Sequence, residues 1–549
     1  MRRLVVALIL LIAVTGGVVL MAGPGAQATP DVMISVNRVD DNEDRDAHLT
    51  LREAVRLATG ELSVGDLHEG ECHQVSTADW LGFPLYECIL LGPPPGVISP
   101  DTIVFDTTVF PPGSPSTIAL GSALPTLSTG GDTIDGTSAG VIVDGVSKAF
   151  DCFDITSANN TIKGLEIYNC MSGVTIHGGA HSNTVGGSSP GESNVISGNW
   201  AGVHIWESGT NGNVVKGNYI GTDATGTAAL PNAYGVHISA FAAQNSVGGS
   251  SPGERNIISG NSQAGVAMFG RGTNGNTVKG NFIGTDAAGT GALPNGRGVQ
   301  IAQNPSGGPQ NNTIGGTAIG EGNVIAQNDW GGVSVYGAAA IGNSIRGNSI
   351  HSNHSDGGKG IENDSGGNTE LAVPTITGFG SVMGTACANC TVDIYSDDED
   401  EGRVYEGSTS ANGAGNWIFS GALDGPNVTA TATDSSGNTS EFSAPVLVPE
   451  SLDSDSDGFT DAVEAYLGTD PADNCPDDPS DDAWPLDMNM DTYVTIVPDV
   501  LTYRGRINTT GGPPADPMWM QRLDLNMDNF ITIVPDILYY RGHINEGCT

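Results

Sequence analysis

Oxygen-bearing side chains follow a regular spacing between residues 453 and 464, where the sequence reads DSDSDGFTDAVE. Ca²⁺ binds about six to eight oxygen atoms, and a glycine at the sixth position permits the sharp turn of a calcium loop. Gly458 stands at that position. The spacing therefore predicts a calcium site, and the alternative is a solvated acidic linker. The expected ligands are Asp453, Asp455, Asp457, the carbonyl oxygen of Phe459, Asp461 and Glu464.

Two later stretches repeat this chemistry in a modified form. LDMNMDTYVTIVPDVLTYRGRIN spans 486–508, and LDLNMDNFITIVPDILYYRGHIN spans 523–545. Neither has glycine at the sixth position, and both have proline at the twelfth. The residues that fit ligand positions 1, 3, 5 and 9 are Asp487, Asn489, Asp491 and Thr495 in the first stretch, and Asp524, Asn526, Asp528 and Thr532 in the second.

These stretches carry a resemblance to known calcium modules. The loop at 453–464 resembles an EF-hand-type loop, and the AYLGTDP that follows it resembles calcium-binding repeats of thrombospondin type 3 and related bacterial proteins. The paired loop–helix units resemble type I dockerins, which attach enzymes to cohesins when calcium is bound. The resemblance implies calcium as a cofactor and a cohesin-like protein as a partner of the C-terminal module.

Two aspartates within a duplicated stretch are candidates for acid–base chemistry. NVVKGNYIGTDATG at 213–226 returns as NTVKGNFIGTDAAG at 276–289 and contains Asp223 or Asp286. Two coils apart, the two aspartates would lie roughly 10 Å from each other, just beyond the ~6.5–9.5 Å carboxyl separation of inverting glycosidases. The alternative is that each aspartate caps its own turn. A third copy at 343–353 ends in Asn353, which can cap a turn but cannot transfer protons, so we expect a structural role and recognise no catalytic set.

A longer repeat contains the duplicated stretch. A Gly-Val pair followed by alternating residues recurs at spacings of 29 to 34 residues, in the forms GVTIH, GVHIW, GVHIS, GVAMF, GVQIA and GVSVY. Each unit has short Val/Ile runs and Asn-Gly or Gly-Gly turns, without a helix of ordinary length. Strand–turn units of this period predict a solenoid of parallel strands with one coil per unit. The recurring NxxxGN motif predicts a ladder of stacked asparagine amides.

The strands of this solenoid present a stripe of side chains to the solvent. In AGVHIW, positions 203 and 205 are apolar and are expected to face inward, so the side chains between them face outward. Aromatic side chains then recur on every second coil, about 10 Å apart, which approximates two units of an extended polysaccharide. Long loops covering the stripe are the alternative. The candidate glycan-binding residues are His204, Trp206, His237, Phe269 and Tyr336.

The repeats NVISGN, GNYIGTDATGTAALPN and NSVGGSSPGERN resemble the right-handed parallel β-helix repeats of bacterial secreted proteins, a superfamily that includes pectate lyases and polygalacturonases. LTLREAVRLA at 49–58 resembles the CSLREA motif that opens many such chains, although His48-Leu49-Thr50 departs from its Cys-Ser start. Thr50 and Glu53 form a capping box that predicts a short helix, expected to cap the first coil. The fold class is therefore mainly β, a pectate-lyase-like β-helix.

The remaining segments give the domain plan. We expect a signal peptide at 1–28, a cap with the first coils at 29–148, and β-helix repeats at 149–368. The segment at 369–448 alternates short β runs with Gly/Asn turns and resembles bacterial Ig-like sandwiches. The EF-hand-type segment at 449–480 and the small α-helical dockerin-like module at 481–549 complete the chain. An uncleaved anchor is the alternative for the apolar N-terminal run.

Charge and cysteine content narrow the function. A formal net charge of -42 disfavours nucleic acid and anionic membranes as partners. Eight cysteines in an exported chain predict disulfides, for which sequence neighbours offer Cys72–Cys88, Cys152–Cys170 and Cys387–Cys390; CANC at 387–390 is otherwise half of a zinc site. We expect a secreted or cell-surface protein that binds polysaccharide or surface glycan. The alternatives are a polysaccharide lyase or glycoside hydrolase in polysaccharide catabolism, and a non-catalytic structural or adhesion protein.

Overall fold

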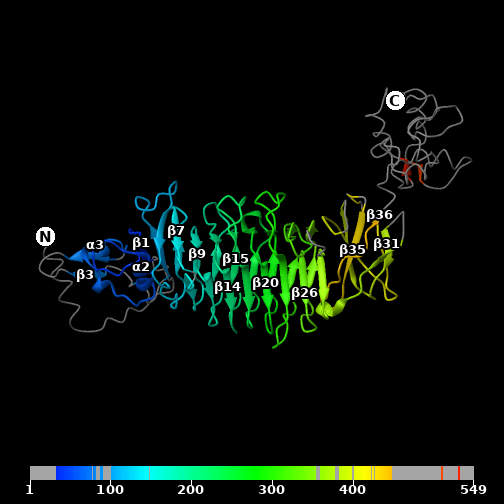
Figure 1. Cartoon of the computed structure of the whole chain (residues 1–549), viewed down its shortest axis with the longest axis horizontal. Coiled ribbons are helices and arrows are strands. Elements are labelled where there is room, and N and C mark those ends of the chain that lie inside the picture. The colour runs from blue at the N-terminus through cyan, green and yellow to red at the C-terminus, as the bar shows by residue number, and fades with distance from the viewer. Residues whose placement is uncertain are drawn as a thin grey trace, which may run out of the picture.

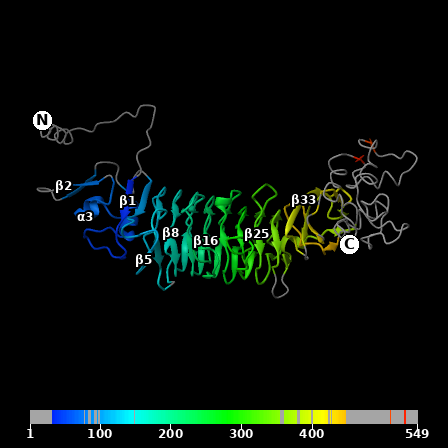
Figure 2. The same ribbon diagram turned by 90° about the horizontal axis from the view of Figure 1, so that it is seen from above.

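The structure is a computed structural model that describes residues 32–447 and two short strands, β37 (Thr509–Thr510) and β38 (Phe530–Ile531). Within 32–447 the description omits 77, 82–86, 91–94, 96–99, 148, 354–358, 378–381, 398–400, 422, 424 and 426. The described residues form an elongated stack of coils with a smaller β unit at its C-terminal end (Figures 1 and 2). The predicted signal peptide and all the predicted calcium ligands lie outside the described residues.

Three parallel sheets run along the stack, and each coil contributes a strand to them. The ten-stranded sheet consists of β1 (Val32–Val36), β4 (Asp101–Phe105), β6 (Thr133–Asp135), β9 (Thr161–Lys163), β12 (Thr184–Gly186), β15 (Val214–Lys216), β18 (Ser246–Gly248), β21 (Thr277–Lys279), β24 (Thr313–Gly315) and β27 (Ser344–Arg346). The nine-stranded sheet consists of β5 (Ser116–Ala119), β7 (Val141–Asp144), β10 (Glu166–Tyr168), β13 (Val195–Ser197), β16 (Tyr219–Ile220), β19 (Ile257–Ile258), β22 (Phe282–Ile283), β25 (Val324–Ala326) and β28 (Ser349–His351).

The eight-stranded sheet contains the Gly-Val strands. It consists of β8 (Phe153–Ile155), β11 (Ser172–Ile176), β14 (Ala201–Trp206), β17 (Tyr234–Ser239), β20 (Ala264–Phe269), β23 (Arg297–Ala302), β26 (Val333–Tyr336) and β29 (Ile361–Asp364). The valine of each Gly-Val pair lies opposite the valine of the next coil, as Val203 does opposite Val236. Val203 and Ile205 are fully buried. The predicted parallel β-helix with one coil per repeat is confirmed.

Asparagine amides form three continuous ladders along the solenoid, which confirms the expected stacking. In each ladder, an Nδ2 donates to the Oδ1 of the next coil, so one coil's donor meets its neighbour's acceptor. The ladders contain Asn160, Asn183, Asn213, Asn245, Asn276, Asn312 and Asn343; Asn194, Asn218, Asn256, Asn281, Asn323 and Asn348; and Asn199, Asn232, Asn261, Asn295, Asn328 and Asn353. The ladders satisfy polar groups that the corners of the coils bury.

The N-terminal end is closed by helix α2 (Leu51–Ala58), which begins as predicted. Thr50 is the N-cap: its Oγ1 accepts from the backbone N–H of Glu53 (3.3 Å), and the Glu53 carboxylate accepts from the Thr50 N–H (3.0 Å). The helix packs on β1 and β4, and its Leu51, Val55 and Leu57 are buried in the solenoid core. The helix covers the first coil, which would otherwise expose an open end.

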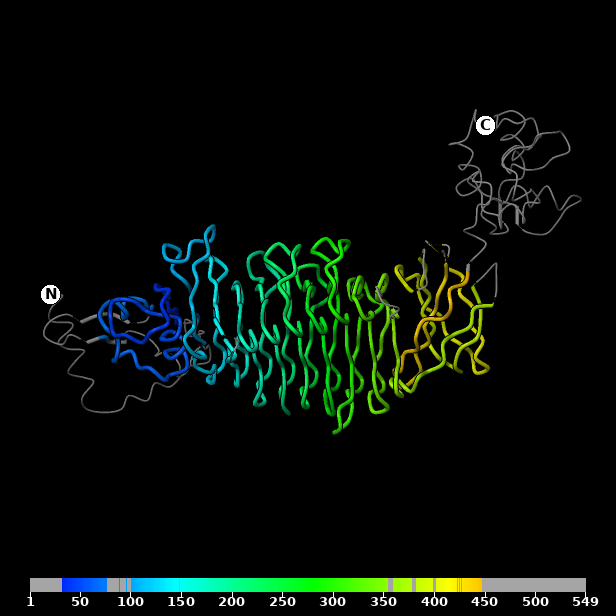
Figure 3. The backbone as a smooth tube through the Cα atoms, in the orientation of Figure 1, coloured from blue at the N-terminus to red at the C-terminus, as the bar shows by residue number. Residues whose placement is uncertain are grey.

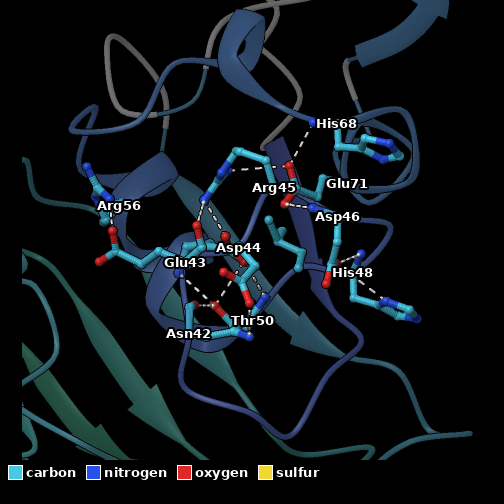
Figure 4. A network of polar contacts seen from close by, with 12 residues as sticks. Asn42, Glu43, Asp44, Arg45, Asp46, His48, Thr50, Arg56, His68 and Glu71 are labelled. Carbon is cyan, nitrogen blue, oxygen red and sulfur yellow. Dashed lines mark hydrogen bonds and ion pairs between the residues drawn. The ribbon is translucent and has the colours of Figure 1, made fainter.

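Polar contacts hold this cap together (Figure 4). Arg45 bridges two carboxylates that are fully buried, those of Glu53 and Glu71. Burial raises the pKa of both acids, and their hydrogen bonds with backbone N–H groups and Arg45 oppose that rise. Glu71 also accepts from the N–H of His68 (2.7 Å) at the start of α3 (Glu69–Cys72). A shared arginine therefore joins the two helices, and the short elements η1 (Val64–Asp66), β2 (Ala78–Leu81) and β3 (Glu87–Leu90) complete the region.

An aspartate occupies the first position of one asparagine ladder. The backbone N–H of Asp132 donates to Asn160 Oδ1 (3.0 Å), and its carboxylate accepts from Thr129 Oγ1 (3.1 Å) and the Asp101 N–H (3.3 Å). Asp132 is buried, and this burial raises the pKa of its carboxyl to about 6. Because the pKa of Asp132 is higher in the folded state than in the unfolded state, folding is not penalised by this group below its unfolded-state pKa. Stability is then lost as the pH rises through about 6.

Asp132→Asn is therefore expected to stabilise the protein at pH 7.5 and to have little effect at pH 4. A difference of about two pKa units corresponds to about 2–3 kcal/mol. Urea unfolding of both proteins at the two pH values measures this difference. Asp66→Asn, at an exposed carboxylate, is the control and should change stability at neither pH. Equal effects of Asp132→Asn at pH 4 and 7.5 would contradict the titration.

The unit after the solenoid, yellow to orange in Figure 3, is built from two antiparallel sheets with their own core. One sheet contains β30 (Thr375–Ile376), β31 (Val382–Thr385) and β34 (Asn416–Phe419), and the other contains β33 (Val404–Ser410), β32 (Thr391–Asp397), β35 (Asn427–Thr433) and β36 (Val446–Leu447). Trp417, Val392, Ile394 and Val428 are buried between the sheets. The strands that the structure describes in this segment are antiparallel, and the Ig-like class stays a prediction.

This β unit closes the C-terminal end of the solenoid. Ile350 on β28 exchanges two backbone hydrogen bonds of 2.8 Å with Gly402. Arg346 on β27 forms a two-pronged ion pair with the fully buried Asp393 of β32, with N–O distances of 2.7 and 2.6 Å. The N–H of Gly347 donates to the hydroxyl of Tyr395 (3.1 Å). The β unit therefore supplies hydrogen-bond partners to polar groups of the last coil. A further coil would pair with these groups if the solenoid continued.

The three disulfides that sequence neighbours offered are all formed: Cys72–Cys88, Cys152–Cys170 and Cys387–Cys390. The CANC motif is thus a small disulfide ring and not half of a zinc site. Cys475 and Cys548 lie outside the described residues. In the described part of the chain, helices are too short and too polar to cross a membrane.

Candidate functional site

The outward face of the eight-stranded sheet carries the predicted stripe in register. His204 lies opposite His237 on adjacent strands, and Trp206 lies opposite Ser239. Ser239 lies opposite Phe269, which lies opposite Ala302, and Ala302 lies opposite Tyr336. The three aromatic residues therefore occupy one column on every second coil, which places successive rings about 10 Å apart along the solenoid.

Four of the five stripe residues, all except Tyr336, belong to a continuous aromatic cluster. Ring centroids of neighbouring members lie between 4.7 and 6.0 Å apart, in stacked or edge-on arrangements. The cluster consists of His177, Trp200, His204, Trp206, Tyr234, His237 and Phe269. Packing of this kind holds the rings in fixed orientations, because each ring fills the space into which its neighbour would turn.

Trp206 lies between two histidine rings. His177 stacks on it at 5.0 Å and His204 at 5.8 Å. The Nε2 of His177 lies 2.8 Å from Asp154 Oδ1, and its Nδ1 lies 3.6 Å from Glu207 Oε2. The two carboxylates fix the orientation of this imidazole, and through it the position of the tryptophan.

His204 and His237 are neutral members of the cluster. Burial lowers the pKa of His204 to about 4 and that of His237 to about 3. Both nitrogens of His237 and the Nε1 of Trp206 are buried without a hydrogen-bond partner among the described residues. The centre of the stripe is thus an uncharged, closely packed aromatic region, and these three buried nitrogens do not reach its surface.

The most exposed rings lie at the borders of the stripe. Tyr336 is 44% exposed and Trp200 is 40% exposed, whereas Trp206 and Phe269 are partly buried and His237 is almost buried. Sequence reasoning missed Trp200, which directly precedes β14, and Tyr234, which is the first residue of β17. The signal was present: Trp200 and Trp330 each stand two residues before the glycine of a Gly-Val pair.

Asp223 and Asp286 have the structural role that was expected. Asp223 Oδ1 accepts from the backbone N–H groups of Thr227 (2.9 Å) and Ala228 (3.1 Å). The carboxylate of Asp286 accepts from three backbone N–H groups of its own loop, and these bonds hold its pKa below the usual range. One alignment was wrong: Asn353 belongs to an asparagine ladder and corresponds to Asn232, because the TDxxG loops are insertions before that position.

The structure does not describe the predicted calcium ligands between 453 and 532. Among the residues that it does describe, His, Cys, Asp and Glu side chains form no group of three or more suited to holding a metal ion. The calcium prediction therefore rests on the loop spacing alone.

No model of a known protein family matches the chain, and no curated protein matches it. Among solved structures it is similar to an alginate lyase from Paenibacillus sp. str. FPU-7, with 16% identity, a TM-score of 0.27, and 49% of this chain and 93% of that chain covered. It is also similar to ORF18 of Geobacillus virus E2 (13% identity, TM-score 0.33, 76% of each chain) and to the Dettilon tailspike protein (12%, 0.19, 63% of this chain and 86% of that one). Similarity at this level does not establish what the chain binds.

Proposed function

We propose that the protein binds polysaccharide or cell-surface glycan along the outer face of its eight-stranded sheet. The observation that supports this is the column of Trp206, Phe269 and Tyr336, in register on every second coil. Apolar faces of sugar rings stack on aromatic faces, and a repeat of about 10 Å approximates two sugar units. His204, stacked beside Trp206, adds a partly exposed neutral imidazole next to the column.

A glycan array probed with the full-length secreted protein tests this function. The double variant Trp206→Ala with Phe269→Ala is expected to lose binding, and Tyr336→Ala, at the exposed end of the column, to weaken it about three- to tenfold. Ile418→Ala is the control, since this residue is exposed on the sandwich. Binding by the double variant that equals wild-type binding would refute the proposal, and circular dichroism confirms that each variant is folded.

We further propose that the C-terminal module attaches the protein to a cohesin-like partner or a cell surface when calcium is bound, with an Ig-like sandwich as spacer. The support is the oxygen-ligand spacing at 453–464 and in the two later loops. Chelation with EDTA is expected to reduce the helical circular dichroism signal of the full chain, and added calcium to restore it. Asp457→Ala with Glu464→Ala should weaken the calcium response, and an unchanged spectrum on chelation would contradict a calcium-folded module.

One observation supports the alternative of a glycan-cleaving enzyme. His177, held by Asp154 at 2.8 Å and stacked on Trp206, is a positioned proton-transfer group at the end of the stripe. Assays for reducing sugars and unsaturated uronides over a polyuronide panel decide between the two functions. Activity that His177→Gln abolishes without loss of binding would establish the enzyme, and absence of turnover supports the binding protein.

A further inference from the structure

A second surface with ligand-binding features lies on the nine-stranded sheet. A groove with a volume of about 350 Å³ runs between the GGSSPGE loops at 186–192 and 248–254. Its lining includes Ser188, Ser193, Tyr219, Arg255, Ile257 and Ala287. The volume is at the lower end of the range for small-molecule sites, about 300–1,000 Å³, and suits one or two sugar residues.

Two contacts hold the guanidinium of Arg255 in the groove, but it forms no ion pair with a described residue. The guanidinium of Arg255 lies 4.0 Å above the ring centroid of Phe282, and its Nε donates to the carbonyl oxygen of Gly280 (3.1 Å). These two contacts fix the plane of the guanidinium. No acidic side chain among the described residues lies within ion-pair distance of Arg255, so its terminal N–H groups remain available to a ligand.

The lysines of the neighbouring coils, unlike Arg255, are all ion-paired among the described residues. Lys163, Lys216 and Lys279 each pair with a glutamate of a neighbouring coil, at 3.0, 3.1 and 2.7 Å. Glu192 and Glu254 belong to the two loops that border the groove, and their lysines neutralise them. Glu321, the partner of Lys279, belongs to the corresponding loop further along the solenoid. In a chain with 20 basic and 62 acidic residues, partners for an arginine are plentiful. An arginine that is positioned by stacking and left without a carboxylate indicates an anion-binding site.

We propose that the groove binds a sugar residue that carries a carboxylate or a sulfate group. The terminal N–H groups of Arg255 bind the anion, because the guanidinium fork matches the geometry of both groups. The partly exposed ring of Tyr219 supplies a surface for the apolar face of the sugar. Ser188 and Ser193 provide hydroxyls at the wall of the groove. The site lies on another sheet from the aromatic stripe and is independent of it.

The internal repeats suggest a substitution of Arg255 that should preserve the fold. A glutamate and an asparagine recur in each loop with one residue between them. That residue is Ser193 in one copy, Arg255 in the next and Gly322 in the third. Asn194 and Asn256, which follow the first two, belong to the same ladder, with Asn218 between them. Arg255→Ser therefore reproduces a loop sequence that the fold already accommodates.

Calorimetric titration of the full-length protein with three trisaccharides of identical linkage tests the proposal. Their terminal residue is glucuronate, glucose 6-sulfate or glucose. We expect the two anionic sugars to bind at least tenfold more tightly than the neutral one, and Arg255→Ser to abolish this preference. Arg255→Lys should retain part of it, since the charge remains but the planar fork is lost. Arg271→Ser, at an exposed arginine elsewhere, is the control.

Hydrogen exchange locates the site, because the loops at 188–193 and 252–255 should gain protection when an anionic trisaccharide is added. The preference should persist in the Trp206→Ala, Phe269→Ala variant, which separates this groove from the stripe. Equal affinity for the three trisaccharides, no binding of either anionic one at millimolar concentration, or a preference unchanged by Arg255→Ser would overturn the proposal. The better of the two anionic ligands identifies which group the groove prefers.

Discussion

Asn256→Ala is expected to lower the local stability of the central coils by about 2–5 kcal/mol, since it removes four hydrogen bonds that each contribute about 0.5–1.5 kcal/mol net. Asn256 Oδ1 accepts from the N–H and the Nδ2 of Asn218, both at 3.0 Å. Its Nδ2 donates to Asn281 Oδ1 and to the carbonyl of Val215, both at 2.9 Å. The substitution removes these four bonds and leaves the backbone N–H of Asn218 without its acceptor. The Nδ2 of Asn218 keeps its bonds to two backbone carbonyls, and Asn281 Oδ1 keeps the backbone N–H of residue 256.

Native-state hydrogen exchange measures this loss, with the amides of β15, β18, β21 and the adjacent coils expected to exchange faster than those near α2. Asn256→Asp separates the donor from the acceptor role, because a carboxylate still accepts from Asn218 but repels Asn281 Oδ1. That variant should be less stable than wild type at pH 7 and should recover part of the loss at pH 4, where it is protonated. Gln263→Ala, at an exposed side chain, is the control. Exchange in Asn256→Ala that matches the control would show that the ladder contributes little.

Arg346→Met is expected to destabilise the junction between the solenoid and the sandwich by about 3–5 kcal/mol, the cost of leaving a buried charge without its partner. Asp393 is fully buried, and both of its carboxylate oxygens accept from Arg346. Burial raises the pKa of Asp393, and the arginine opposes that rise. Without the arginine, the buried carboxylate must be ionised without a cation beside it or take up a proton.

The double variant Arg346→Met with Asp393→Leu decides how the pair acts. Replacing both members of a buried pair with apolar residues is often nearly neutral, so the double variant should recover most of the lost stability. Lys279→Met, which breaks a solvent-accessible pair on an earlier coil, should cost less than about 1 kcal/mol. Urea unfolding measures all three. A loss in Arg346→Met no larger than that in Lys279→Met would contradict the role of the buried pair.

The solenoid could be predicted from the sequence because its signals are local and repeated. Alternation in GVHIW fixes which side chains face inward, and recurrence of the Gly-Val pair fixes the register between coils. The capping box of Thr50 and Glu53 fixed the start of α2 for the same reason, since both residues lie within one helical turn. Because the pattern recurs on every coil, one chain provides several independent examples of it.

Contacts between distant segments could not be predicted in this way. The ion pair of Arg346 with Asp393 joins residues 47 positions apart in sequence, and no repeat marks either one. The rings of Trp200 and Tyr234 reach the stripe from positions just outside the alternating pattern. Asn353 was misassigned to the TDxxG turn because the letters align although an inserted loop shifts the structural position. Inserted loops change spacing without changing the coil beneath them.

The measurement that tests glycan binding most directly is the dependence of affinity on oligosaccharide length, for a glycan that the full-length protein binds on an array. The column from Trp206 to Tyr336 spans four coil steps, about 19 Å. Affinity should therefore rise from the disaccharide to an oligosaccharide of about four to six units and then level off. In Trp206→Ala with Phe269→Ala the rise should disappear. Equal affinity for the disaccharide and the hexasaccharide, or the same rise in the double variant, would contradict binding along this sheet.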